Sequence, residues 1–256
     1  MAYETLTLDV DGPIGRLWLD RPQKRNALNP TALEEIAAAC EALQRRFDVP
    51  VVVIGGRGPS FCAGADRTDP PARMIRGSGA NARERRWVSQ IGRRAVEAIE
   101  RLEAITIARL HGHVIGGGML LAAACDLRLA AEGTVFHIPE VDLGLPLSWG
   151  GAPRLAREVG AARAKELILL CDRFDAAAAE RYGLVNRVVP ADQLDAAVDD
   201  WARRLAAKPD WALHMTKSQF QASGVTRTLG DVSATDGDLL IEATGEDPTR
   251  FLWKRD

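Results

Sequence analysis

The sequence lacks the clustered ligands of a metal site and the paired thiols of a redox or disulfide site. Its four histidines do not stand near cysteines at zinc-finger spacing, and no two cysteines share a C-x-x-C spacing. The cysteines are Cys40, Cys62, Cys125 and Cys171. We therefore expect free thiols that pack in a reduced interior, and no metal site.

The sequence also lacks an excess of one charge and any long apolar run. The net charge of -2 and the pI near 6.1 argue against general nucleic-acid binding. No stretch reaches the roughly 18 apolar residues of a membrane span, and the first ten residues show no basic start followed by an apolar block. With 46% hydrophobic and 27% charged residues, the chain is typical of globular proteins, and we expect a cytoplasmic location.

Three glycine motifs of common enzyme folds are missing as well. A dinucleotide fingerprint G-x-G-x-x-G would need a third glycine where Phe61 follows Gly56 and Gly58. Neither the P-loop pattern G-x-x-x-x-G-K-[ST] nor the nucleophile elbow G-x-S-x-G occurs. These absences argue against three of the usual phosphate-binding and hydrolase scaffolds.

What the sequence does contain is an alternation of strand and helix patterns. Residues 4–19 predict a β-hairpin, residues 31–47 a helix with Asn29 or Thr31 as its cap, and residues 49–56 a buried strand. One helix is expected over 82–104, and mostly helices from about 191 to 245. We predict an α/β core over residues 1–195 and a helical region over 196–256.

Two segments run from an apolar strand into a glycine-rich turn, "VVVIGGRGPSFCAGAD" at 51–66 and "ITIARLHGHVIGGGML" at 105–120. Backbone amides at such turns are free to face a ligand, and a following helix adds positive potential. Two loops that each deliver one amide would form an oxyanion hole, which stabilises negative charge on a carbonyl oxygen. Taken singly, either glycine run is better explained as a tight turn that permits close packing.

Four segments in order give the chain a family resemblance: 19–36, 51–66, 111–147 and 176–194. Together they resemble the enoyl-CoA hydratase/isomerase family, the crotonase superfamily, over about residues 5–205. The resemblance implies a crotonase-like spiral of ββα units in two roughly perpendicular sheets. It further implies a C-terminal helical region that supports trimers or dimers of trimers, and an acyl-CoA thioester as substrate, with no other cofactor.

By the same resemblance, the amides of Ala65 and Gly117 would form the oxyanion hole. Family hydratases carry two glutamates, and here Glu140 matches the second while Leu120 stands at the first. The short-chain Δ3-Δ2-enoyl-CoA isomerases of the family have this single-glutamate arrangement with leucine. The resemblance therefore favours an isomerase in which Glu140 is both base and acid, with a pKa raised by burial. An enoyl-CoA hydratase with an atypical site and a non-catalytic acyl-CoA-binding protein stay as alternatives.

Other residues near Glu140 offer weaker candidates. Asp142 shares a face with Glu140 only if the segment is a strand, and Ser148 stands where the family's dienoyl-CoA isomerases have an aspartate. We interpret His137 as a packed histidine and Asp126 as a structural acid that satisfies backbone donors. Trp149 could line the acyl pocket or belong to the core.

A basic segment follows the first glycine turn. Residues 67–94 hold eight arginines against two acids, a charge that would attract the phosphates of CoA. By resemblance, the further substrate- and CoA-binding candidates are Lys24, Arg25, Ala27, Ala63, Asp66, Gly116, Leu120, Trp149, Phe251 and Lys254.

Overall fold

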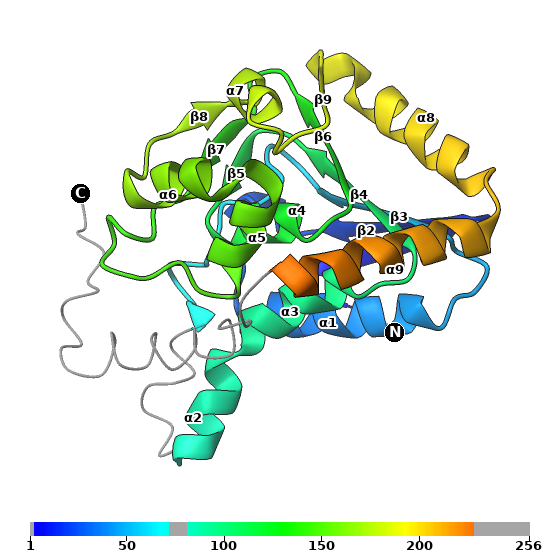
Figure 1. The fold of residues 1–256 in the computed structure, drawn as a ribbon. Coiled ribbons are helices and arrows are strands. Elements are labelled where there is room, and N and C mark those ends of the chain that lie inside the picture. Colours follow the sequence, from blue (N-terminus) through cyan, green and yellow to red (C-terminus); the bar gives the residue numbers. More distant parts are fainter. Residues whose placement is uncertain (1–2, 72–80, 228–256) are drawn as a thin grey trace.

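A computed structural model describes residues 3–71 and 81–227 of the chain, with side chains in the last helix as far as residue 221. Figure 1 shows strands enclosed by helices, with one short helix extending away from the body. Within the described part of the chain, no helix is both long enough and apolar enough to cross a membrane.

The larger sheet has six strands in the order β1-β2-β3-β4-β6-β9. The expected hairpin is confirmed as an antiparallel pair, and every later pairing in this sheet is parallel. Its strands are β1 (Leu6–Asp11), β2 (Ile14–Leu19), β3 (Val51–Gly56), β4 (Ile105–Leu110), β6 (Leu127–Ala131) and β9 (Arg187–Val189). All six residues of β3 are buried, as its unbroken apolar run predicts.

A smaller sheet contains β5 (His113–Ile115), β7 (Val135–His137) and β8 (Phe174–Asp175). β5 pairs in parallel with β7, and β7 pairs antiparallel with β8. β5 ends directly before the glycine run at 116–118, and the Gly116 amide donates to the carbonyl of His137 in β7 at 2.9 Å. The small sheet therefore fixes where that run lies.

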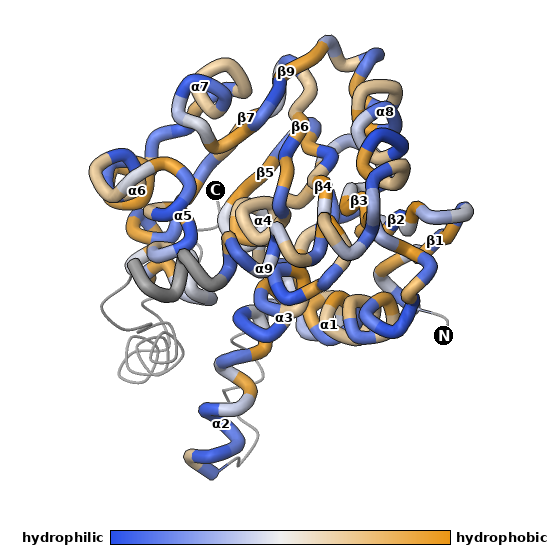
Figure 2. The backbone as a smooth tube through the Cα atoms, turned by 45° about the vertical axis from the view of Figure 1, so that its right-hand side comes forward, coloured by the Kyte–Doolittle hydropathy of each residue, from blue (hydrophilic) through white to orange (hydrophobic). Residues whose placement is uncertain are grey.

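Helices cover both faces of the large sheet (Figures 1 and 2). On one face α1 (Pro30–Gln44) packs against α3 (Ile91–Glu100), and on the other α8 (Leu194–Ala206) buries Leu194, Val198 and Ala202. Asn29 caps α1 by accepting a hydrogen bond from the Ala32 amide at 3.0 Å. The other helices are η1 (Pro22–Lys24), α2 (Ala82–Ser89), α4 (Gly117–Ala123), α5 (Gly151–Val159), α6 (Ala161–Leu169), α7 (Ala176–Arg181), η3 (Ala191–Gln193) and α9 (Asp210–Arg227).

The single helix expected over 82–104 is wrong, because the chain breaks at Gln90 into α2 and α3. Side chains satisfy carbonyls in the last turn of α2: the Ser89 hydroxyl donates to the Arg86 carbonyl, and Arg94 Nη1 donates to the Trp87 carbonyl. The Gln90 amide donates to the Trp87 carbonyl three residues back, so the last turn of α2 is tightened and the helix ends there. From this break α2 extends away from the body (Figure 2).

The C-terminal helices are tied to the core by a buried ion pair. Lys217 of α9 lies 2.7 Å from Asp126 and donates to the Ala104 carbonyl at 3.0 Å. Asp126 also accepts from the amide and hydroxyl of Thr106, which agrees with its interpretation as a structural acid. The division into units at residue 195 stays a prediction.

Candidate active site

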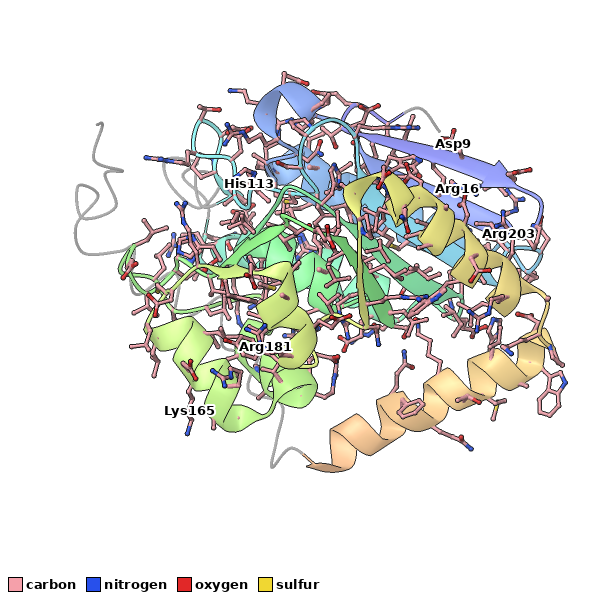
Figure 3. All side chains as sticks on the ribbon, turned by 90° about the horizontal axis from the view of Figure 1, so that it is seen from above. Asp9, Arg16, His113, Lys165, Arg181 and Arg203 are labelled. Atoms are coloured by element: carbon pink, nitrogen blue, oxygen red, sulfur yellow. The ribbon has the colours of Figure 1, made fainter. Side chains whose placement is uncertain are left out.

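The two glycine turns lie side by side. Cys62 and Val114 form a parallel bridge, in which the Cys62 amide donates to the His113 carbonyl and the Ile115 amide to the Cys62 carbonyl, each at 3.0 Å. The His113 ring also lies 3.0 Å from the Ser60 hydroxyl (Figure 3). Two turns that are 50 residues apart in sequence are thereby joined as neighbouring strands.

Glycine is required where the two turns touch. A Cβ on Gly64 would lie 2.9 Å from the Ile115 carbonyl oxygen, and one on Gly118 would lie 2.7 Å from the Cys62 carbonyl oxygen. Real Cβ atoms essentially never approach an oxygen so closely, so any side chain would push the turns apart. Close backbone contact is therefore one physical reason for glycine in these two positions.

Each turn presents a backbone amide without a protein acceptor. Around Ala65 the chain pairs with Leu28: the Leu28 amide donates to the Gly64 carbonyl and the Asp66 amide to the Leu28 carbonyl, both at 2.8 Å. Gly117 is the first residue of α4, where an amide has no acceptor within the helix. In the described part of the chain neither the Ala65 nor the Gly117 amide donates a hydrogen bond. Leu28 links the two, because a Cβ on Gly117 would lie 3.1 Å from Leu28 Cδ1.

The Glu140 carboxylate lies directly over Gly116. A Cβ on Gly116 would lie 2.6 Å from Glu140 Oε1, and Gly116 itself has φ +49°, so this position excludes a side chain twice. The loop that carries Glu140 is fixed by its own backbone. The Gly116 amide donates to the His137 carbonyl at 2.9 Å, and the Glu140 carbonyl accepts from the amides of Leu143 and Leu145.

The surroundings of this carboxylate favour its protonated form. Its Oε2 atom is shielded from solvent and has no hydrogen-bond partner in the described structure. Burial raises the pKa of Glu140 to about 7, against a smaller opposing effect of its own backbone amide. A carboxyl group with this pKa can both accept and donate a proton at neutral pH.

The remaining walls beside the glycine run are apolar. Leu120, where a second glutamate would stand, is only 2% exposed, and its Cδ2 lies 2.7 Å from the place of a Cβ on Gly151. The indole of Trp149 is 9% exposed and lies against Gly117. Asp142 is exposed, and the His137 ring binds the Cys171 carbonyl at 2.8 Å, as a packed histidine would. A buried leucine therefore stands at the sequence position where family hydratases carry the other glutamate.

The candidate CoA-binding segment around residues 24–27 is locked to the first glycine turn. The Ala63 amide donates to the Arg25 carbonyl at 2.9 Å, and Arg21 donates to the Ala27 carbonyl at 2.5 Å. Arg25 and its neighbour Asn26 both have positive φ, and the Asn26 side chain donates to the carbonyls of Arg57 and Ser60. Lys24 and Arg25 remain exposed, as contacts to a charged ligand require.

Asp66 helps to hold the segment around residues 24–27 in place through its ion pair with Arg21. Its Oδ2 lies 2.8 Å from Arg21 Nη2, and its Oδ1 accepts hydrogen bonds from the amide and hydroxyl of Thr68. Burial acts to raise its pKa, but the hydrogen bonds from Thr68 and the charge of Arg21 outweigh burial and lower the pKa to about 2. Asp66 is therefore a permanently charged anchor whose oxygens face the protein.

The basic segment is only partly placed. Arg73 and Arg76, and also the tail candidates Phe251 and Lys254, lie outside the described residues. Of the other arginines, Arg93 pairs with Glu97 and Arg94 stacks on Trp87, 4.1 Å from the ring centre. Arg67, Arg83 and Arg86 are exposed.

Sequence reasoning missed several supporting residues. Arg21 and Asn26 lie inside the segment that carries the resemblance, so their position was a usable signal. Arg154 and Glu100 carried none, because their contact spans 54 residues.

The sequence and the fold of this chain are similar to those of known proteins. The family model "Enoyl-CoA hydratase/isomerase" matches residues 10–255. A crotonyl-CoA hydratase of Syntrophomonas wolfei is 36% identical over 100% of this chain and 97% of its own length. A peroxisomal Delta(3,5)-Delta(2,4)-dienoyl-CoA isomerase of Arabidopsis thaliana is 34% identical over 94% of this chain and 91% of its own. A crystal structure from Thermobifida fusca, in complex with CoA, aligns with a TM-score of 0.77 at 32% identity, covering 94% of this chain and 91% of that one.

Proposed function

This chain belongs to the enoyl-CoA hydratase/isomerase family, and from that premise we propose that it shifts the double bond of a 3-enoyl-CoA to C2, with Glu140 as the sole acid and base. The observation that carries the proposal is a single carboxylate over Gly116, with the buried Leu120 where a second would stand. Relatives named hydratase and dienoyl-CoA isomerase both occur, so the reaction is argued from the site.

In this mechanism the thioester oxygen accepts hydrogen bonds from the amides of Ala65 and Gly117. The Glu140 carboxylate removes a proton from C2, and the electron pair of that C–H bond moves into a dienolate whose negative charge is on the held oxygen. Glu140, now protonated, returns the proton to C4, and the double bond is left between C2 and C3. A pKa of about 7 suits a group that must do both steps.

Hydration of a 2-enoyl-CoA makes a further demand that this site meets poorly. A water molecule must be oriented and deprotonated, work that family hydratases divide between two carboxylates. Leu120 offers hydrocarbon there, and loss of one such group commonly costs about 10²–10⁴ in rate. A hydratase with an atypical site is the second candidate, favoured by the crotonyl-CoA hydratase that matches the whole chain.

On the CoA side, we assign the nucleotide to the segment with Lys24, Arg25 and Ala27, which the Ala63 amide joins to the first glycine turn. The exposed arginines after Asp66 would attract the phosphates. The reaction needs no cofactor beyond the CoA that the substrate itself carries. Contacts from Phe251 and Lys254, and assembly as a trimer or a dimer of trimers, stay predictions.

The test supplies 3-hexenoyl-CoA and crotonyl-CoA separately in heavy water. The proposal expects 2-hexenoyl-CoA that carries deuterium wherever Glu140 exchanged its proton with solvent, and slow or no hydration of crotonyl-CoA. Fast formation of 3-hydroxybutyryl-CoA together with unchanged 3-hexenoyl-CoA would show a hydratase. Tight binding of both thioesters without turnover or exchange would show a binding protein.

A substitution at Leu120 tests the same division from the other side. Leu120→Glu should gain hydration of crotonyl-CoA, because it restores a second carboxylate on the first turn of α4. The matched control is Leu120→Gln, which has the same shape but no base. If both variants fold and neither or both gain hydration, this position does not control the choice of reaction.

A further inference from the structure

Trp149 has a backbone conformation that a bulky residue rarely adopts. Its φ is +57°, in the left-handed region, which is costly for side chains larger than glycine or asparagine. Such a conformation persists only where the surroundings fix it. It therefore raises the question of what holds Trp149 there.

A buried ion pair holds the turn. Arg154, 7% exposed, donates from Nη1 to the carbonyls of Trp149 at 2.8 Å and Gly150 at 3.0 Å. Its other nitrogens donate to Glu100 Oε2 on α3 at 3.0 and 2.6 Å. Arg157 also pairs with Glu100 at 2.8 Å. This network joins α5 to α3 and fixes the turn that bears the indole.

The indole lies between two glycines on different helices. A Cβ on Gly92 of α3 would overlap the Cε2 and Nε1 side of the ring, and a Cβ on Gly117 of α4 would overlap its Cζ3 and Cη2 edge. Neither helix could carry a side chain at these positions without displacing the indole. One face of the ring system is thus supported by α3 while its outer edge reaches the residue that donates the oxyanion amide.

We propose that Trp149 limits the acyl group to a short chain, of about four to six carbons. The inference rests on the proposed function, since it needs the thioester carbonyl at the Gly117 amide. A carbonyl held there places C2 to C4 near the Glu140 carboxylate over Gly116. The carbons that follow leave this point past the indole, which already occupies the space against Gly117 and is prevented from retreating by α3. Gly92, Arg154 and Glu100 are positioning residues that act through Trp149.

A purely structural role for the indole makes a different prediction. Trp149 also belongs to the main hydrophobic core, so its removal will lower stability in either case. Loss of packing alone would weaken all acyl-CoA esters by a similar factor. If the indole instead blocks the path of the acyl chain, its removal changes how the affinity depends on chain length. That dependence therefore distinguishes the two roles.

The test measures binding of saturated butyryl-, hexanoyl-, octanoyl- and decanoyl-CoA to the wild type, Trp149→Ala and Trp149→Phe. Burial of one methylene contributes about fourfold in affinity. We expect the wild type to gain little beyond hexanoyl-CoA and Trp149→Ala to gain about fourfold for each further methylene, with Trp149→Phe between them. Trp211→Ala, at a tryptophan that is 72% exposed on α9, is the matched control and should keep the wild-type profile.

Because saturated esters cannot isomerise, this measurement separates the two proposals. A steady fourfold gain in the wild type up to decanoyl-CoA would overturn the chain-length limit and leave the isomerase proposal untouched. Failure to turn over 3-enoyl-CoA with an unchanged binding profile would overturn the isomerase proposal alone.

A double-substitution cycle tests the support from α3, while Trp149→Phe carries the chain-length test if Trp149→Ala folds poorly. Gly92→Ala should push the indole towards Gly117 and lower hexanoyl-CoA affinity more than tenfold. In the Trp149→Ala background the same change should have less than a threefold effect, because the overlapping ring is gone. Equal losses in both backgrounds would show that Gly92 does not act through Trp149 and would contradict the positioning argument.

Discussion

Asp66 and Glu140 are two carboxylates beside the same pair of glycine turns, and they have opposite surroundings. Asp66 is 2% exposed and is met by Arg21 and by the amide and hydroxyl of Thr68, which lower its pKa to about 2. Asp66 Oδ2 and Glu140 Oε2 are both shielded from solvent and outside hydrogen-bond geometry, but in the described structure only Asp66 has an ion-pair partner. Burial raises the pKa of Glu140 to about 7.

The difference shows how one residue class serves two purposes within one site. A buried acid with partners is held charged and in place, so it can anchor a loop but cannot exchange a proton near neutral pH. A buried acid without partners is held close to its point of ionisation, which is unfavourable for folding and useful for proton transfer. Burial acts to raise the pKa of both groups, and only Asp66 has a cation and donors that outweigh it.

The largest expected effect comes from removing the proton-transfer group. Glu140→Gln keeps the shape but cannot accept a proton, so isomerisation of 3-hexenoyl-CoA should fall by about 10²–10⁴. CoA affinity should change little, as measured by calorimetry with hexanoyl-CoA. Asp142→Asn, at an exposed acid two residues away, is the control and should keep its rate. A comparable loss of rate in Asp142→Asn would contradict the assignment of Glu140 as the sole acid and base.

The next largest effect is expected when Asp66 loses its ion-pair partner Arg21. Arg21→Ala leaves the Asp66 charge buried without its cation, and loss of one partner of such a pair costs about 3 kcal/mol of unfolding free energy. Urea denaturation at pH 7 measures the change. Arg45→Ala removes an exposed arginine that pairs with Glu41, so it should cost well under 1 kcal/mol. A small loss for Arg21→Ala would mean that Thr68 alone holds Asp66.

Removal of the Glu140 carboxylate should raise stability at high pH, whereas Arg21→Ala should lower it. The pKa of Glu140 is raised in the folded state, so its contribution to stability is present below the unfolded pKa near 4.5 and is lost as the pH rises through about 7. At pH 8 Glu140→Gln should therefore have a free energy of unfolding higher than that of the wild type, by up to about 3 kcal/mol, as measured by urea denaturation. The two proteins should converge below pH 4.5. A constant difference across this range would show that Glu140 does not titrate as proposed.

The smallest expected effect is the pH dependence of the rate. Because the basic form of Glu140 is required, kcat/KM for 3-hexenoyl-CoA should fall about tenfold per pH unit below pH 7 and level off above it. Asp66 stays charged throughout this range, so the CoA-binding segment should not contribute. A rate that is flat between pH 5 and 8 would contradict the assignment of a base with a pKa near 7.

Local patterns in the sequence were sufficient for much of the fold. The hairpin of β1 and β2 and the buried strand β3 follow from local patterns, whereas the cap of α1 was left open between Asn29 and Thr31 and the structure has Asn29. The break at Gln90 was missed because Arg94 and Ser89 satisfy the carbonyls of α2 through their side chains, and periodicity does not register such contacts.

The candidate site likewise has features that the sequence predicts and features that it does not. The glycine turns and Glu140 were predicted from motifs, and Leu120 in place of a second acid is visible in the sequence alone. The position of Trp149 between Gly92 and Gly117 was left open, since the indole and its supports come from three different helices or turns. The role of Arg154 as the group that holds this turn could not be predicted, because its contacts with Glu100 join α5 to α3.

By itself the sequence determined which chemical groups this protein has: two glycine turns with bare amides, one glutamate after a short strand, and a leucine where a second acid could have been. Only the tertiary structure decided what those groups can do. It paired Cys62 with Val114, set Glu140 over Gly116, and gave Asp66 an ion pair with Arg21 that Glu140 does not have in the described structure. The physical reason is that the pKa and reactivity of a carboxyl group depend on its solvation and its neighbours, and in a folded chain those neighbours come from distant parts of the sequence.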